Sequence, residues 1–252
     1  MIVPCERRLP VDRIESFPVS AVSGMALRLA WGALDVAVDD NAGDVQVTLS
    51  GDESAVEAVT LRCDDGFLTL RQPLLPPFRR SLRAQVLLPR TWKGALSAST
   101  VAAPLNASGV TGTDLQLTTV TGALRAEALG GITVALRTVT GEIDAEALLA
   151  GQLALRSVTG DITLSGVDAR QITLRTVAGN TYAEECAPFD RMDAVTVSGD
   201  LHITAPEGTV SARLRSLRRR PGNHPIEHTP AVRMTSVAGD LEINQPEDFE
   251  EE

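Results

Sequence analysis

Hydrophobic and polar residues recur with a fixed period in the central part of the chain. From residue 122 onward, three segments read GALRAEALGGITVALRTVT, GEIDAEALLAGQLALRSVT and GDITLSGVDARQITLRTVA, and successive segments begin 19 residues apart. In register they place apolar residues in shared columns, such as Leu124, Ile143 and Ile162, or Leu136, Leu155 and Leu174. A period of about 20 residues indicates stacked units, each of which covers the apolar face of the next.

Each unit contains two short runs in which apolar and polar residues alternate. Alternation with a period of two is typical of a β-strand with one buried face, so each unit predicts two strands joined by turns. We expect turn glycines at Gly131 and Gly141, because glycine adopts positive φ without a Cβ clash. The apolar columns extend from Leu96 to Ile243. One of them marks eight coils of 19–20 residues through Val101, Val120, Val139, Val158, Val177, Val197, Leu217 and Val237.

The predicted fold is all-β: a parallel β-solenoid with two strands per coil. Parallel strands lie about 4.8 Å apart, and parallel crossover connections are almost always right-handed, so we expect a right-handed solenoid. Two facing strand layers enclose a thin aliphatic core, which agrees with 43% hydrophobic but only 3% aromatic residues. No segment has the periodicity of a helix.

The period also divides the chain. We expect an N-terminal extension over residues 1–20 and one solenoid domain over residues 21–245, followed by an acidic tail at 246–252. Within the domain, the regular coils start at residue 91 and are interrupted by a loop at 218–230. Strands at 21–90 lack the period, and they are expected to form an N-terminal β cap or irregular first coils, because an open solenoid end exposes an unpaired edge.

Composition limits the function classes. A net charge of −10 argues against general nucleic-acid binding. No run of 18 apolar residues occurs and the N-terminus has no secretory h-region, so we expect neither a transmembrane segment nor export. Cys5, Cys63 and Cys186 form no C-x-x-C pair and fit reduced thiols. The prediction is a cytoplasmic protein; the alternative is a membrane-peripheral or surface location reached by a non-classical route.

The turns add a family resemblance. Val-Thr-Gly and related turns precede Glu142-Ile143, Asp161-Ile162, Asp200-Leu201 and Asp240-Leu241. With the pieces around Leu34, Leu68 and Val86, they resemble the bacterial putative-adhesin domain of unknown function, the toast-rack β-solenoid family, over roughly residues 21–245. The resemblance implies a non-catalytic β-solenoid, often attached to or encoded near envelope-stress and membrane-associated proteins. It provides no catalytic residues.

Two arginine groups are candidate interaction surfaces. The first, Arg137, Arg156 and Arg175, shares one column, so the side chains should stack about 5 Å apart on the solvent face. Such a row either attracts an anionic partner or is a solvated row balanced by nearby acids, for which we consider Glu142, Glu146 and Asp161.

The second group is a basic cluster near the C-terminus, formed by Arg213, Arg215, Arg218, Arg219 and Arg220. It is a solvated loop or a contact for anionic lipid headgroups, nucleic acid or an acidic segment, including the chain's own tail. Nucleic acid is not expected, because no aromatic residue is interleaved for base stacking.

Metal and catalytic sites are not expected. The positions after the turn glycines form a polar column that could bind calcium, but Asp and Asn are also good turn residues: Ala123, Glu142, Asp161, Asn180, Asp200 and Asp240. His224 and His228 have a zinc-like spacing, yet neighbouring prolines forbid the helix that would bring them together. No motif for a nucleophile, a phosphate loop or a cofactor is present.

The sequence therefore predicts a non-enzymatic scaffold or interaction module that binds an unknown protein or envelope-associated partner through a flat, strand-built face. A self-assembling protein that stacks end to end is the alternative, since solenoids with weak caps can do so. A carbohydrate-active β-helix enzyme is the third possibility.

Overall fold

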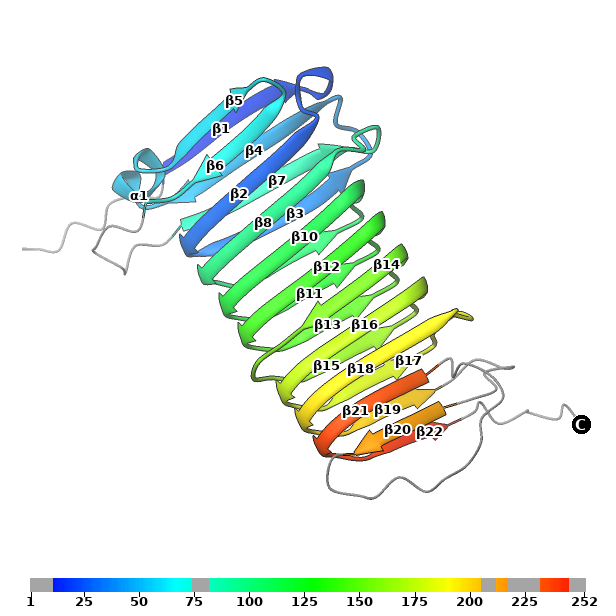
Figure 1. Cartoon of the computed structure of the whole chain (residues 1–252). Coiled ribbons are helices and arrows are strands. Elements are labelled where there is room, and N and C mark those ends of the chain that lie inside the picture. Colours follow the sequence, from blue (N-terminus) through cyan, green and yellow to red (C-terminus); the bar gives the residue numbers. More distant parts are fainter. Residues whose placement is uncertain (1–10, 74–81, 205–211, 217–231, 245–252) are drawn as a thin grey trace, which may run out of the picture.

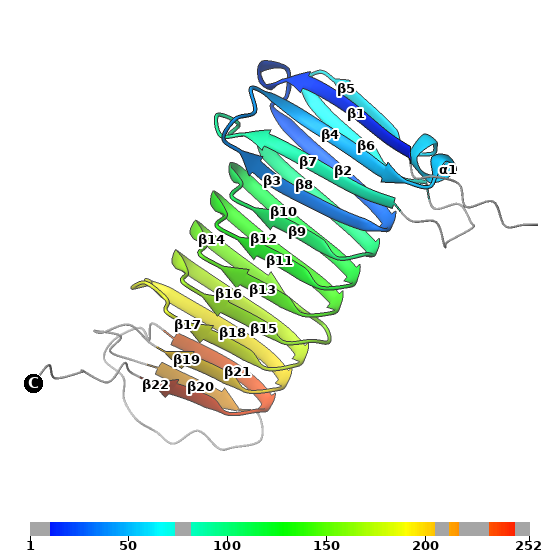
Figure 2. The same ribbon diagram turned by 180° about the vertical axis from the view of Figure 1, so that it is seen from behind.

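The computed structural model describes residues 11–73, 82–204, 212–216 and 232–244. Two eleven-stranded sheets, here called sheet A and sheet B, face each other along an elongated body (Figures 1 and 2). Sheet A contains, in spatial order, β1 (Val11–Pro18), β4 (Asp44–Gly51), β7 (Leu82–Pro89), β3 (Ala33–Asp39), β9 (Leu105–Ser108), β11 (Leu124–Glu127), β13 (Ile143–Glu146), β15 (Ile162–Ser165), β17 (Thr181–Glu184), β19 (Leu201–Thr204) and β22 (Leu241–Asn244).

Sheet B contains, in spatial order, β20 (Ala212–Ser216), β21 (Val232–Ala238), β18 (Arg191–Ser198), β16 (Asp168–Ala178), β14 (Leu149–Arg156), β12 (Gly130–Thr140), β10 (Thr111–Thr121), β8 (Ala95–Ala102), β2 (Gly24–Trp31), β6 (Phe67–Arg71) and β5 (Thr60–Asp64). The described residues outside the sheets include one helical turn, α1 (Glu53–Glu57), and a short 3-10 turn at Val19–Ala21. Neither is long or apolar enough to cross a membrane.

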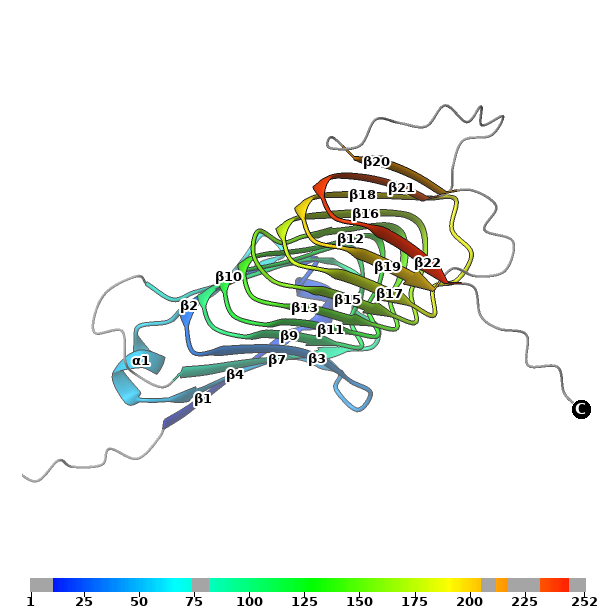
Figure 3. The same ribbon diagram turned by 90° about the horizontal axis from the view of Figure 1, so that it is seen from below.

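The repeat builds the fold that its period predicts. Each coil contributes a four-residue strand to sheet A and a longer strand to sheet B, and successive coils pair in parallel (Figure 3). The pairing keeps the 19-residue offset, because Leu124 lies opposite Ile143 and Leu136 lies opposite Leu155. An all-β architecture with two stacked parallel ladders is thus confirmed.

One continuous aliphatic core lies between the sheets. Leu124, Leu136 and their equivalents in the other coils are completely or almost completely buried. Trp92 is the one aromatic residue among the described buried side chains, and it lies at the N-terminal end, where its Nε1 donates a hydrogen bond to the carbonyl of Val22 at 2.9 Å. The thin core explains the low aromatic content.

The glycine turns have a second cause besides backbone conformation. Gly141 has φ +145°, and a Cβ there would lie 2.2 Å from the carbonyl oxygen of Gly122 in the preceding coil. Only glycine therefore permits the coils to stack at this corner. The prediction for Gly131 was wrong, because this residue lies inside β12, and the corner before it is formed by Ala128 at φ +51°.

One apolar column faces away from the core. Val101, Val120, Val139, Val158, Val177 and Val197 each retain 41–46% of their accessible surface. The alternation in β12 points Val134, Leu136 and Thr138 inward, so Val139 must point outward. Grouping this column with the buried ones was therefore wrong, and a column of threonine and serine residues occupies the adjacent buried position.

The N-terminal third continues the stack and then changes direction. β2 and β3 pair in parallel with β8 and β9, so they form a further coil. Beyond them, β1 with β4, β4 with β7, and β5 with β6 pair antiparallel. Strand β1 lies within residues 1–20, the segment expected to be an N-terminal extension. Burial alternates along β1, but polar and apolar residues are exchanged: Arg13 and Glu15 lie on its more buried side, and Ile14 is exposed.

Candidate functional site

The predicted arginine row lies on the outer face of sheet B. Arg137 on β12 is opposite Arg156 on β14, which is opposite Arg175 on β16, and all three are exposed. Within the described part of the chain, none of them has a carboxylate within ion-pair distance. Of the acids considered as counter-charges, Glu146 ends a strand of sheet A, and Oδ1 of Asp161 accepts a hydrogen bond from the backbone of Asn180 at 2.7 Å.

The same column continues through strands outside the repeat. From Arg137 the register leads to Thr118 on β10, then to Ser99 on β8. It then reaches Arg28 on β2 and Arg71 on β6. We call this row the basic column: Arg71, Arg28, Ser99, Thr118, Arg137, Arg156 and Arg175. Its first two arginines were not predicted, because β2 and β6 lack the 19-residue period.

The exposed valines run beside the basic column. Five of them lie two residues after a member of the basic column, and Val197 lies two residues after Val195, which pairs with Arg175. We call Val101, Val120, Val139, Val158, Val177 and Val197 the valine column. On β2 the corresponding position is Ala30, between Leu29 and Trp31, which pair with Thr100 and Ala102. A cationic row and an apolar row therefore run in parallel along the outer face of sheet B.

A hollow of about 530 Å³ interrupts these rows near the N-terminal end. Its lining includes Arg28 and Arg71 on one side and Ala30, Val101 and Val120 on the other. The basic column has the short side chains of Ser99 and Thr118 at this level, and β6 ends at Arg71 while β2 continues to Trp31. Both features remove atoms from the surface and leave the hollow.

Gln72 closes the sheet edge where β6 ends. Its backbone N–H donates to the carbonyl of Arg28 at 2.9 Å, and its Oε1 accepts hydrogen bonds from the N–H groups of Ala30 at 2.8 Å and Trp31 at 3.1 Å. The side chain thus replaces the missing strand neighbour. Gln72 lines the hollow but is only 5% exposed. Its Nε2 is buried and has no hydrogen-bond partner among the described residues.

The second predicted basic group falls mostly outside the described residues. Arg213 and Arg215 belong to β20, where the backbone pairs with Arg233 and Thr235 of β21. Arg218, Arg219 and Arg220 lie outside the described residues, as do His224 and His228, the loop at 218–230 and the acidic tail at 246–252.

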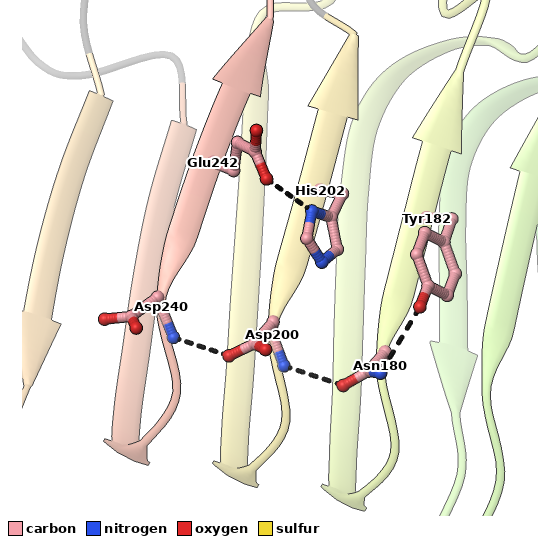
Figure 4. Close-up of polar contacts among 6 residues, drawn as sticks. All are labelled: Asn180, Tyr182, Asp200, His202, Asp240 and Glu242. Atoms are coloured by element: carbon pink, nitrogen blue, oxygen red, sulfur yellow. Dashed lines mark hydrogen bonds and ion pairs between the residues drawn. The ribbon is translucent and has the colours of Figure 1, made fainter.

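The polar turn column forms a hydrogen-bonded ladder (Figure 4). Oδ1 of Asn180 accepts from the N–H of Asp200 at 3.0 Å, and Oδ1 of Asp200 accepts from the N–H of Asp240 at 2.8 Å. These oxygens satisfy backbone donors of the next coil, which is the turn role of Asp and Asn. No group of three or more potential metal ligands was found in the described part of the chain.

A short polar column on sheet A was not recognised in the sequence. The rings of Tyr182 and His202 stack with centroids 5.1 Å apart, and Nδ1 of His202 lies 2.9 Å from Oε2 of Glu242 (Figure 4). The N–H of the Asn180 side chain reaches the Tyr182 hydroxyl at 3.3 Å. The steps of 20 and 40 residues between these positions were the available signal. The three side chains brace neighbouring coils, since each belongs to a different strand.

Two stacked parallel ladders around an aliphatic core define a β-solenoid. The family model described as Toastrack DUF4097 matches residues 8–218, so the chain belongs to this family. The match begins before residue 11, where β1 begins. A comparison with curated proteins finds no match.

Several solved structures share the fold. A putative adhesin from Bacteroides fragilis is 14% identical with a TM-score of 0.61, and the alignment covers 94% of this chain and 97% of that one. A putative lipid binding protein from Parabacteroides distasonis is 12% identical with a TM-score of 0.61, covering 94% and 92%. A putative adhesin from Parabacteroides merdae is 13% identical with a TM-score of 0.52, covering 93% and 95%. At these identities the likeness shows the fold alone.

Proposed function

We propose that this chain is a non-enzymatic interaction scaffold that binds an acidic segment of a partner protein, in a process associated with the bacterial cell envelope. The main support is the in-register row of Arg137, Arg156 and Arg175, which has no carboxylate partner among the described residues. At a spacing near 5 Å, neighbouring guanidinium groups repel each other by about 0.8 kcal/mol in water, and carboxylates bound between them relieve this repulsion.

The two columns select the chemistry of the partner. Guanidinium groups present a planar fork of donors that matches a carboxylate, so an acidic peptide suits the part of the basic column formed by Arg137, Arg156 and Arg175. The valine column beside it offers apolar surface to side chains that alternate with the acids. A partner with both features would cover both columns at once, whereas a purely acidic polymer would use only one.

The proposal is tested with a labelled peptide of alternating glutamate and leucine, with a lysine–leucine peptide as the reference. Fluorescence anisotropy should detect binding of the acidic peptide to the full chain. Reversing charge in R137E/R156E/R175E should weaken it about 100-fold or more, from the loss of three exposed ion pairs and added repulsion. The matched variant R90E/R125E/R170E changes the net charge equally at exposed positions outside the column, and it should retain affinity within a few-fold.

Equal losses in both triple variants would show that only net charge matters, and equal binding of both peptides would remove the basis of the proposal. Vesicles containing anionic lipid form a further arm. If they bind through the same three arginines while the acidic peptide does not, the partner is a membrane surface and the proposal of a protein partner is wrong.

Self-assembly is a second candidate, favoured by one observation. In the described part of the chain, β20 and β22 each pair with a strand on one side only. At the opposite end, β1 turns Arg13 and Glu15 toward its more buried side, a feature that discourages strand addition. Sedimentation velocity separates the candidates, because self-assembly predicts growth with protein concentration and a scaffold predicts one monomeric species.

A carbohydrate-active enzyme receives less support, since none of the described residues that line the hollow is a carboxylate and glycoside hydrolysis commonly uses two. Three finer features stay predictions within this proposal: a right-handed winding, eight coils, and a cytoplasmic or membrane-peripheral location. A crystal structure would determine the handedness and the number of coils, and cell fractionation would determine the location.

A further inference from the structure

The hollow on sheet B differs chemically from one side to the other. Arg28 and Arg71 are adjacent in the register of β2 and β6, and both are exposed. Neither has an ion-pair partner among the described residues. The opposite wall contains Ala30, Val101 and Val120, and Pro73 also lines the hollow. A ligand that fills this space therefore meets positive charge at one end and hydrocarbon at the other.

The polar groups at the charged end are the guanidinium groups of Arg28 and Arg71, donors that have no acceptor among the described residues. Two guanidinium groups one strand apart can share a single carboxylate or phosphate, which binds them more strongly than a neutral acceptor would.

The apolar end opens onto a longer path. Val101 and Val120 begin the valine column, which continues past the hollow through Val139, Val158, Val177 and Val197. Strands of sheet B lie about 4.8 Å apart, so the six valines span about 24 Å along the solenoid. An unbranched hydrocarbon chain lying along this row would cover side chains that water now contacts.

We propose that the hollow is a binding site for an amphipathic anion, a ligand with one negatively charged head and an unbranched alkyl or acyl tail. The head lies between Arg28 and Arg71, and the tail lies over Ala30, Val101 and Val120. Its volume of about 530 Å³ is within the usual range for small-ligand sites. This site goes beyond the proposed peptide surface, because it uses the two arginines of the basic column that lie outside the Arg137 to Arg175 row.

The test is isothermal titration calorimetry of the full chain with laurate below its micelle concentration. Octanoate and decanoate measure the effect of the tail, and affinity should rise about two- to fourfold for each added methylene group. Dodecyltrimethylammonium has a similar tail and the opposite head charge, and it should not bind. Vesicles with and without phosphatidylglycerol distinguish a bilayer lipid from a free amphiphile as the source of the anionic head and tail.

The variant R28A/R71A should weaken laurate binding at least tenfold, since both head contacts are removed. The matched variant R137A/R156A removes two arginines of the same column outside the hollow and should leave laurate binding unchanged. V120D places a charge in the apolar wall and should abolish binding of the tail. Arg28, Arg71 and Val120 are exposed in the fold, so circular dichroism should show the same melting temperature for the arginine variants as for the parent chain.

Laurate or vesicle binding that is lost in R28A/R71A and kept in R137A/R156A supports the site and identifies its source of ligand. Binding that is equal in both variants, equal for the cationic amphiphile, or absent up to the solubility limit overturns it. The peptide assay fails or succeeds independently, because it depends on Arg137, Arg156 and Arg175. Loss of one activity with retention of the other therefore shows which of the two proposals is wrong.

Discussion

A buried hydroxyl column offers the sharpest test of the packing argument. Its members point inward between the sheets, next to the valine column: Thr100, Thr119, Thr138, Ser157, Thr176, Thr196 and Ser236. In the first two coils the hydroxyls are satisfied, because Thr100 Oγ1 lies 2.9 Å from the carbonyl oxygen of Ala103 and 3.0 Å from Thr119 Oγ1. The hydroxyl oxygens of the remaining five, Thr138 among them, have no partner among the described residues.

Replacing Thr138 with valine keeps the shape of the side chain and removes the unpaired hydroxyl. Thr138 is 4% exposed, and burying a hydroxyl without a hydrogen bond costs about 1–3 kcal/mol. Thr138→Val should therefore raise the free energy of unfolding by about 1–2 kcal/mol, which corresponds to about 2–4 °C in melting temperature for each kcal/mol in a chain of this size. The neighbour-matched variant Thr119→Val removes a bonded hydroxyl instead and should lower the free energy of unfolding by about 1 kcal/mol.

Urea denaturation followed by circular dichroism measures both variants, and an unchanged dependence of free energy on urea confirms that the unfolding transitions are comparable. If Thr138→Val destabilised the chain as much as Thr119→Val, the hydroxyl of Thr138 would have a partner in solution. In that case the column would be a satisfied polar network, and the reasoning from unpaired hydroxyls would be refuted.

Two further predictions concern the corners and the thiols. Gly141→Ala should lower the free energy of unfolding in urea by more than about 2 kcal/mol, because Gly141 has positive φ and a Cβ there would lie 2.2 Å from the Gly122 carbonyl oxygen. A Cβ at Gly43 meets open space, so Gly43→Ala should change the free energy of unfolding by less than about 1 kcal/mol. Similar effects of the two variants would contradict the close stacking of the coils at Gly141. Burial raises the pKa of the Cys186 thiol from its ordinary 9.0 to about 11. The thiol therefore stays protonated to a higher pH in the folded chain than in the unfolded chain, and the free energy of unfolding falls as pH rises from 9 to 11. The free energy of unfolding of the parent chain should fall across this pH window more steeply than that of Cys186→Ala. In a C5S/C63S background, the remaining Cys186 thiol should react only slowly with Ellman's reagent at pH 8. Parallel pH curves or fast labelling would contradict the burial of this thiol.

Part of the candidate surface was predictable from the sequence. Arg137, Arg156 and Arg175 stand 19 residues apart, and a stacked repeat must place such residues in one row. It was not predictable that these arginines have no carboxylate partner in the described part of the chain, since this depends on which face each acid occupies. Glu146 lies on sheet A, whereas the three arginines lie on sheet B.

The hollow and its arginines needed the tertiary structure. Arg28 and Arg71 join the basic column only because β2 and β6 pair in parallel beside β8, at sequence separations that follow no repeat. Gln72 gains its role from the place where β6 ends. Long-range backbone pairing of this kind has no local signal in the chain, so neither position stood out.

The sequence by itself determined the order of stacking along the solenoid, that is, which residue lies on which in successive coils. A repeat translates each residue onto its equivalent in the next coil, so spacing alone defines the columns. Only the tertiary structure decided which columns face the core. Near the end of each strand, Thr138 and Val139 are neighbours, and hydrophobicity favours burying the valine. Val134 and Leu136 determine which face of β12 is buried. Alternation along the strand then turns Thr138 inward and leaves Val139, like the other valines of its column, exposed.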